Sequence, residues 1–249
     1  MLIKYLLLSL LSTPLIAQPD GVPASCSNAT LTGNYGYLLN GTAGGLPITT
    51  VGQIATNGNG TISGSLTTSS NGSISNLVEL LGSYQISPNC TGTMTITPAG
   101  LSSSNFSVSV TSGGKQIQMV EIDSGTVESG TAYAQGIATC STVGTKGGYG
   151  MLGGGSIIGS GPQTYGGEIN LRGDGTITGT ETGSANGTIF QNAAVSGAFK
   201  IDRICQGGAV ITVGQGSLIH LNLVVVNAQK TVLFIQTDAS SLSSGILQQ

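Results

Sequence analysis

The chain repeats itself at an offset of about 115 residues, and this duplication constrains the fold more than any other feature. The segment GNGTISGS starts at Gly58, and its near copy GDGTITGT starts at Gly173. Other segments fall into the same register: GNYGYL with GGYGML, GSYQISPNC with GAFKIDRIC, and KQIQMVEIDSGTVESG with KTVLFIQTDASSLSSG. Several independent anchors at a nearly constant offset indicate a tandem repeat. We therefore expect two homologous domains, residues 26–137 and residues 138–249.

Each copy carries two cysteines at matching places. Cys26 matches Cys140 and Cys90 matches Cys205, and the two cysteines are separated by 64 positions in the first copy and by 65 in the second. In an exported chain, four cysteines favour disulfides over free thiols. Because a duplicated unit must first have folded alone, the economical pairing is within each copy, Cys26 with Cys90 and Cys140 with Cys205. A pairing between the copies and reduced thiols are the alternatives.

Val, Ile and Thr recur along the chain between short segments of Gly, Asn, Ser or Pro, a pattern that predicts many short strands joined by turns. No segment shows a helical stripe longer than two turns, and the nearest candidate is NLVELLGSY at Asn76. About eight antiparallel strands per copy can close into a barrel or fold into a sandwich. We favour an all-β fold of two tandem antiparallel β-barrels, since closure leaves no exposed sheet edge, and keep the sandwich as the alternative. The strands expected in the first copy are 34–40, 49–56, 61–68, 80–86, 91–97, 105–111, 116–122 and 131–137.

The duplicated phrase is interpreted as a turn followed by a strand. Asn-Gly and Asp-Gly between strands predict type I′ hairpin turns, which need positive φ at both central residues. Gly64 and Gly179 fall inside the following strand, where a missing side chain indicates a bend, a bulge or close packing. The second copy spells RGD at Arg172–Asp174, at a tip where an adhesion ligand would lie, but Asn57–Asn59 stand there in the first copy. We therefore interpret this tripeptide as part of the turn.

The N-terminal residues have the order of a secretory signal peptide. Lys4 precedes a short apolar run, and the small residue Ala17 comes before polar sequence. The run is shorter than the roughly 20 apolar residues of a membrane-spanning helix. We therefore expect a signal peptide over residues 1–17, a linker over 18–25, and a secreted or periplasmic mature protein without a transmembrane segment.

The composition argues against several functions. Seven cations stand against ten acids, so the chain lacks the clustered Lys and Arg that nucleic-acid binding requires. Aromatic residues make up 4% and Trp is absent, whereas outer-membrane barrels carry aromatic girdles at both interfaces. We expect no nucleic-acid partner and discount an outer-membrane barrel.

The sequence offers few candidates for catalysis, metal binding or cofactor binding. His220 is the only histidine, and the matching residue in the first copy is Asn105, so the repeated unit does not depend on an imidazole. Glu121 and Asp123 would share a strand face as a pair of acids of the kind glycosidases use, but only the second acid persists in the other copy, where Gln236 replaces the first. Zinc needs several His, Cys or acidic ligands. We expect no catalytic, metal or cofactor-binding residues and interpret these side chains as structural.

The strands LIHLNLVVVN and TVLFIQT of the second copy are apolar on both faces. Strands of this kind are covered on both sides. One side would line the barrel interior, and the other would pack against the sister domain or another chain. Small barrels also hold apolar molecules, so a dry ligand cavity is the functional alternative to ordinary packing.

The set of YGY near the first cysteine, GxGTIxGS/T, GxYxI before the second cysteine, and the closing Lys–Asp–Ser–Gly pattern resembles a group of uncharacterised secreted bacterial proteins built from Gly- and Thr-rich tandem β repeats. More remotely, the strand count is similar to calycin and allene-oxide-cyclase barrels, a resemblance that implies a small apolar ligand. We expect a non-catalytic structural or binding module, whose partner would be a small apolar molecule or a cell-surface component. A lipocalin-like carrier is the alternative, and a cyclase-like or glycosidase enzyme comes third.

Overall fold

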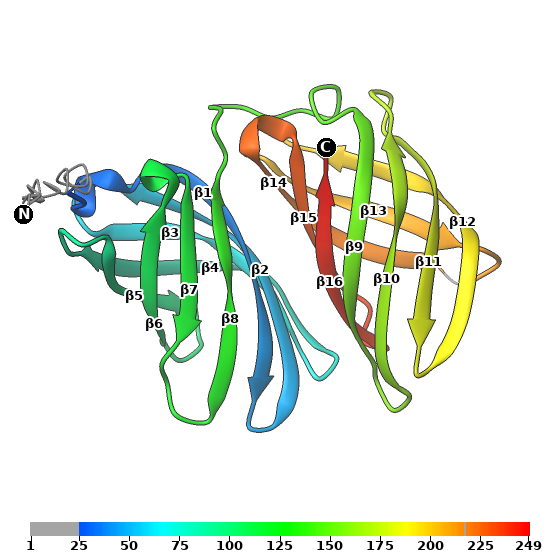
Figure 1. The fold of residues 1–249 in the computed structure, drawn as a ribbon, viewed down its shortest axis with the longest axis horizontal. Coiled ribbons are helices and arrows are strands. Elements are labelled where there is room, and N and C mark those ends of the chain that lie inside the picture. The colour runs from blue at the N-terminus through cyan, green and yellow to red at the C-terminus, as the bar shows by residue number, and fades with distance from the viewer. Residues whose placement is uncertain (1–24, 217) are drawn as a thin grey trace, which may run out of the picture.

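The computed structural model describes residues 25–216 and 218–249 and contains two closed antiparallel barrels of eight strands each (Figure 1). The expectation of an all-β fold with two tandem barrels is confirmed. The expected signal peptide and nearly all of the expected linker lie outside the described residues. Barrel 1 comprises β1 (Thr32–Ala43), β2 (Leu46–Asn57), β3 (Thr61–Ser70), β4 (Ser73–Ile86), β5 (Thr91–Pro98), β6 (Ser104–Thr111), β7 (Gln116–Glu121) and β8 (Thr126–Ala134). Barrel 2 comprises β9 (Gly147–Ile157), β10 (Gly161–Leu171), β11 (Thr176–Ala185), β12 (Thr188–Ile201), β13 (Gln206–Val213), β14 (Leu218–Val226), β15 (Thr231–Gln236) and β16 (Ser241–Gln248).

Each barrel is a meander in which every strand pairs with the next one along the chain, and the last strand pairs with the first. Period-2 alternation explains the two surfaces of each strand, because successive side chains point to opposite faces. In β6, for example, Phe106, Val108 and Val110 are buried inside barrel 1, while the intervening residues face outward. The segment NLVELLGSY, the nearest candidate for a helix, lies within β4.

One end of each barrel is closed, and it is the end that holds the disulfide. Cys26 is bonded to Cys90, and Cys140 to Cys205. In barrel 1 the chain before β1 crosses this end as the short 3₁₀ helix Asn28–Thr30, which is followed by the fully buried Leu31. The Tyr84 hydroxyl donates a hydrogen bond to the Leu31 carbonyl at 2.8 Å and fixes this segment. The opposite end of each barrel, where the β1–β2 and β9–β10 hairpins turn, is the open end.

The duplicated phrase forms hairpin turns, but the expected type I′ geometry at these turns is wrong. In RGDG only Gly175 has positive φ, and the Asp174 carboxylate accepts the Thr176 N–H at 2.9 Å. This arrangement is a three-residue hairpin loop whose last residue is a left-handed glycine. Type I′ geometry, with positive φ at two consecutive residues, occurs instead at Asn71–Gly72 and Asn186–Gly187. Those turns lie at the open ends of the barrels.

The glycines inside the repeated strands mark close backbone approach. A Cβ added at Gly64 would lie 2.0 Å from the Gln53 carbonyl oxygen, and one at Gly179 would lie 2.2 Å from that of Glu168. No side chain fits at either place without moving the neighbouring strand. The interpretation of both glycines as sites of bending or close packing is confirmed.

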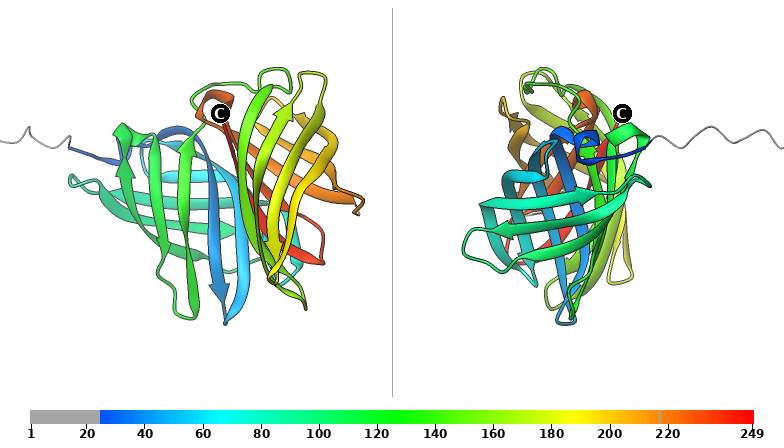
Figure 2. Two further views of the ribbon diagram at one scale, coloured as in Figure 1. Left: turned by 45° about the vertical axis from the view of Figure 1, so that its right-hand side comes forward. Right: turned by 90° about the vertical axis from the view of Figure 1, so that its left-hand side faces the viewer.

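The two barrels lie side by side (Figure 2). Besides the core inside each barrel, a hydrophobic cluster lies between them, which we call the second core. Val224 and Val226 of β14 and Leu233 and Ile235 of β15 point out of barrel 2 and cluster with Val51 of β2. The alternate residues of the same strands, including Val225 and Phe234, lie in the interior of barrel 2. The expectation that these strands are covered on both faces is therefore confirmed, and the sister barrel covers the outer face.

Polar contacts frame this second core. The Gln53 side chain donates a hydrogen bond to the Ile204 carbonyl at 2.8 Å, and the Gln206 side chain donates to the Ser65 hydroxyl at 2.7 Å. Gly36 of β1 permits a close approach of the barrels, because a Cβ there would lie 2.5 Å from a methyl group of Val224. The interface thus combines an apolar centre with hydrogen bonds at its edge.

Both barrels point their open ends the same way. The β1–β2 and β9–β10 hairpins lie together at the lower side of Figure 1. At this side a Cβ on Gly72 of the β3–β4 turn would lie 2.5 Å from the Ala239 carbonyl oxygen of barrel 2. No helix in residues 25–216 and 218–249 is long and apolar enough to cross a membrane. The two disulfides are compatible with an extracytoplasmic protein.

Candidate ligand-binding site

The open end of barrel 1 contains a pocket of about 280 Å³ that we call the barrel 1 pocket. Most of its wall is apolar. The rest of the wall carries hydroxyl groups, one carboxyl group and one phenol. The apolar lining residues are Leu39, Ile48, Leu66, Ile96, Pro98, Leu101 and Phe106. The polar lining residues are Tyr37, Thr50, Thr68, Ser70, Ser75, Ser102, Ser104 and Glu128.

Tyr37 is positioned by a glycine on the neighbouring strand. It lies on β1 directly opposite Gly52 of β2, and a Cβ on that glycine would lie 2.4 Å from the tyrosine ring. The ring therefore lies flat over the glycine and is fully buried. Its hydroxyl has no hydrogen-bond partner among the described residues. Burial raises the pKa of Tyr37, and the nearby Glu128 raises it further, so the phenol is neutral.

Glu128 lines this pocket, and the carboxyl group of Glu121 lies beside it. Glu121 lies near the end of β7 and Glu128 near the start of β8, on the inner face of the barrel, and Glu128 is only 6% exposed. Their carboxyl groups hydrogen-bond each other, an arrangement that needs one proton between them. Oε2 of Glu121 and Oε1 of Glu128 have no partner in the described part of the chain.

The titration of this pair follows from its burial. Desolvation, followed by the charge of Glu121, raises the pKa of Glu128 to about 7, and burial also raises the pKa of Glu121. Two carboxyls in contact in an apolar environment share a proton and titrate as a pair. No basic side chain lines the pocket, and within the described residues the only ion pair is His220 with Asp238. Near neutral pH the pair therefore carries about one negative charge without a counter-ion.

We expect this pair to make the folded protein less stable as pH rises. Glu128 titrates near 4.5 when unfolded and at about 7 when folded, so the folded state binds more protons between these values. The free energy of unfolding should fall across this window, by about 3 kcal/mol for Glu128 alone. Urea unfolding at pH 5 and pH 8 measures the change, and Glu128→Gln should remove this part of it.

The lowered pKa values of Asp123, Asp174 and Asp238 do not interfere with this measurement. Their stabilising effect is lost only below their ordinary value of 3.8, outside the window. An equal fall in stability between pH 5 and pH 8 in the wild type and in Glu128→Gln would contradict the assignment.

Barrel 2 has a pocket at the equivalent place, and its own side chains fill it. Eight positions of the barrel 1 pocket recur in its lining at the offset of 115 residues, but its volume is about 100 Å³. Tyr165 replaces Thr50, and Phe190 replaces Ser75. The Tyr165 hydroxyl hydrogen-bonds Ser243, the counterpart of Glu128, at 2.6 Å. Two aromatic rings and an internal hydrogen bond therefore occupy the space that is open in barrel 1.

Both barrels use a tyrosine against a glycine, but on different strands. Tyr165 lies opposite Gly153, as Tyr37 lies opposite Gly52. The counterpart of Tyr37 in barrel 2 is Met151, so the ring there comes from the neighbouring strand and lies closer to the open end. The packing of a tyrosine ring against a glycine therefore leaves a pocket open in barrel 1 and fills the equivalent pocket in barrel 2.

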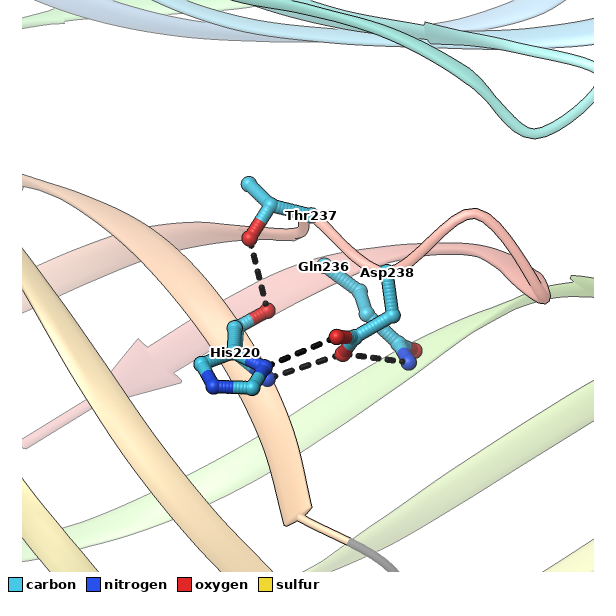
Figure 3. A network of polar contacts seen from close by, with 4 residues as sticks. All are labelled: His220, Gln236, Thr237 and Asp238. Atoms are coloured by element: carbon cyan, nitrogen blue, oxygen red, sulfur yellow. Dashed lines mark hydrogen bonds and ion pairs between the residues drawn. The ribbon is translucent and has the colours of Figure 1, made fainter.

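His220 lines neither the barrel 1 pocket nor its equivalent in barrel 2. It lies on the outer surface of barrel 2 (Figure 3). Its side chain is 52% exposed, and its Nδ1 lies 2.8 Å from Oδ1 of Asp238, whose other oxygen accepts the His220 backbone N–H at 2.8 Å. In barrel 1, Asn105 makes the same two contacts with Asp123, at 2.7 and 2.9 Å. The duplicated pair therefore links the start of one strand, β6 or β14, to the turn that follows the next strand, whichever side chain is present.

The structure separates the acids that the sequence grouped. Asp123 lies beyond the end of β7 and binds Asn105, whereas Glu121 contacts Glu128 on the next strand. The pair in the pocket was therefore missed, although both residues alternate inward across one hairpin, which is a usable signal. Arg172 and Asp174 are exposed at the turn tip, as expected for a tip. Groups of three or more potential metal ligands are absent from the described residues.

Comparison of the chain with protein-family models, with curated proteins and with solved structures finds no match. The class of the protein is therefore defined by its own architecture. It is an all-β protein of two fused eight-stranded barrels, each carrying one disulfide, with a pocket of apolar and polar side chains at the open end of the first barrel.

Proposed function

We propose that the protein is a non-catalytic extracytoplasmic binding protein that holds a small, largely apolar molecule in the barrel 1 pocket. The observation that carries this proposal is the contrast between equivalent pockets in two copies of one fold. The pocket in barrel 1 has about 280 Å³ of space, whereas the one in barrel 2 has about 100 Å³ and is filled by Tyr165 and Phe190. Packing of this fold therefore does not require the space in barrel 1.

The polar groups of the barrel 1 pocket support the same proposal. A buried polar atom without a partner costs about 1–3 kcal/mol. The Tyr37 hydroxyl and one oxygen each of Glu121 and Glu128 are in this state, while the Tyr165 hydroxyl of barrel 2 is paired. A bound molecule that pairs these atoms would recover that free energy. The pocket volume is close to the lower limit of ligand sites, about 300 Å³.

Transplanting the side chains of barrel 2 into barrel 1 tests the proposal. We expect Thr50→Tyr combined with Ser75→Phe to fill the pocket and to weaken binding of the neutral apolar dye N-phenyl-1-naphthylamine by at least about tenfold, the range expected when apolar contacts of a few kcal/mol are lost. Dye fluorescence titrated against protein measures the affinity.

Ser129→Tyr provides the matched control, because it adds the same ring to an exposed position on the outer face of β8. This variant should bind the dye as the wild type does. Thermal unfolding checks that both variants are folded. Wild-type protein that does not bind the dye, or a filled variant that binds it equally well, would refute the proposed pocket.

A further inference from the structure

We propose that the barrel 1 pocket recognises ligands carrying a primary ammonium group on a small apolar body. This inference rests on the proposed function and adds the chemical class of the ligand. It is drawn from three buried oxygen atoms without partners in the described part of the chain. Tyr37 Oη and Glu128 Oε1 belong to residues that line the pocket, and Glu121 Oε2 belongs to the carboxyl group that contacts Glu128.

A primary ammonium group matches this set in hydrogen-bond donors. It carries three N–H donors and no acceptor, and a phenol or a carboxylate oxygen accepts such bonds. A hydroxyl group has one donor and would leave two of the three oxygens unpaired. The aliphatic and aromatic side chains of the pocket, such as Leu39, Ile96 and Phe106, would contact the body of the ligand.

Charge favours the same group. The titratable groups that face Glu128 are Glu121 on β7 and Tyr37 on β1, and Thr50 on β2 adds a hydrogen bond. None of them is a cation, and no basic side chain from residues 25–216 or 218–249 lines the pocket. An ammonium ion would therefore neutralise a buried negative charge, and hydrogen bonds between ions are about twice as strong as neutral ones. A ligand carboxylate would be repelled.

Ammonium binding also has a signature that neutral binding lacks. A cation beside Glu121 and Glu128 favours loss of the proton that the two carboxyls share. Binding near pH 7 should therefore release up to about one proton per amine bound. An uncharged ligand of the same shape leaves the shared proton in place.

The test compares three ligands of one shape: 2-phenylethylamine, 2-phenylethanol and phenylacetate. Calorimetric titration of the full chain at pH 7, in two buffers of different ionisation enthalpy, gives both the affinity and the number of protons released. We expect the amine to bind at least about tenfold tighter than the alcohol, with proton release for the amine only. Phenylacetate should bind most weakly.

Two carboxamide variants test the role of the acids. Glu128→Gln, and independently Glu121→Gln, should lower the affinity for the amine to that for the alcohol and leave the alcohol unchanged. Glu181→Gln is the matched control, because Glu181 is a buried acid of the filled pocket in barrel 2. It should bind the amine as the wild type does.

The outcomes separate the inference from the proposed function. If the amine and the alcohol bind equally, or Glu128→Gln weakens both alike, the ammonium preference is wrong while the pocket remains a binding site. If neither these ligands nor the apolar dye binds, both the inference and the proposed function fail.

Discussion

Leu233→Asp is expected to lower the free energy of unfolding by about 4 kcal/mol and to separate the two barrels. Leu233 is fully buried on the outer face of β15, where it packs with Val51 of barrel 1 and Val224 of β14. A carboxylate there would be buried without a cation, a change that costs about 3–5 kcal/mol. Equilibrium unfolding in urea measures the loss, and small-angle scattering should show a longer particle.

The homologous position in barrel 1 supplies the control for this prediction. Gln118 corresponds to Leu233, but it lies exposed on the outer face of β7. Gln118→Asp should change stability by no more than about 0.5 kcal/mol, the usual range for surface substitutions. If Leu233→Asp unfolds at the wild-type urea concentration and keeps the wild-type scattering profile, the second core does not hold the barrels together.

Removing the disulfide of barrel 1 has an expected cost of similar size. Replacing both Cys26 and Cys90 by serine opens a loop closed over a sequence separation of 64 residues. Loops of this length contribute about 4 kcal/mol through the entropy of the unfolded chain. The bond also anchors the segment that carries Leu31 across the closed end, so its hydrogen bond from Tyr84 should be lost as well. The thermal unfolding midpoint of the double variant measures the effect.

The same double replacement at Cys140 and Cys205 is the matched comparison, because its loop is one residue longer. The two variants should lose comparable stability if loop entropy dominates. Dye binding should weaken only when the barrel 1 bond is removed, since the pocket lies in that barrel. A midpoint unchanged by either replacement would show that the bonds do not stabilise the folded state.

Much of the fold follows from the sequence because it depends on local patterns. Period-2 alternation gives each strand an inner face, and the duplication transfers each assignment from one copy to the other. The outward-facing valines of β14 predict the interface between the barrels, because a sheet face exposed to solvent would carry polar side chains at these positions. The strand boundaries do not follow from these patterns alone: β8 begins at Thr126 rather than Thr131, because Gly130 continues the strand by close packing against β1.

The pocket itself was beyond sequence reasoning for a different reason. Its existence depends on whether side chains from several strands fill the barrel, and Thr50 and Tyr165 are both acceptable strand residues. Only the three-dimensional arrangement shows that the tyrosine fills the space that the threonine leaves open. Similarly, the sequence pattern places Glu121 and Asp123 on one face of a single strand. The residue that Glu121 contacts is instead Glu128, which lies on the next strand across the hairpin.

The barrels meet through non-equivalent faces, and this geometry would let a third barrel add in the same head-to-tail manner. Contacts of that type do not close and can grow into fibres. The free face of barrel 1 carries Ser109, Thr111 and Gln118 at the positions of Val224, Val226 and Leu233 in barrel 2. These polar residues leave this face of barrel 1 without the apolar surface that barrel 2 presents to its neighbour.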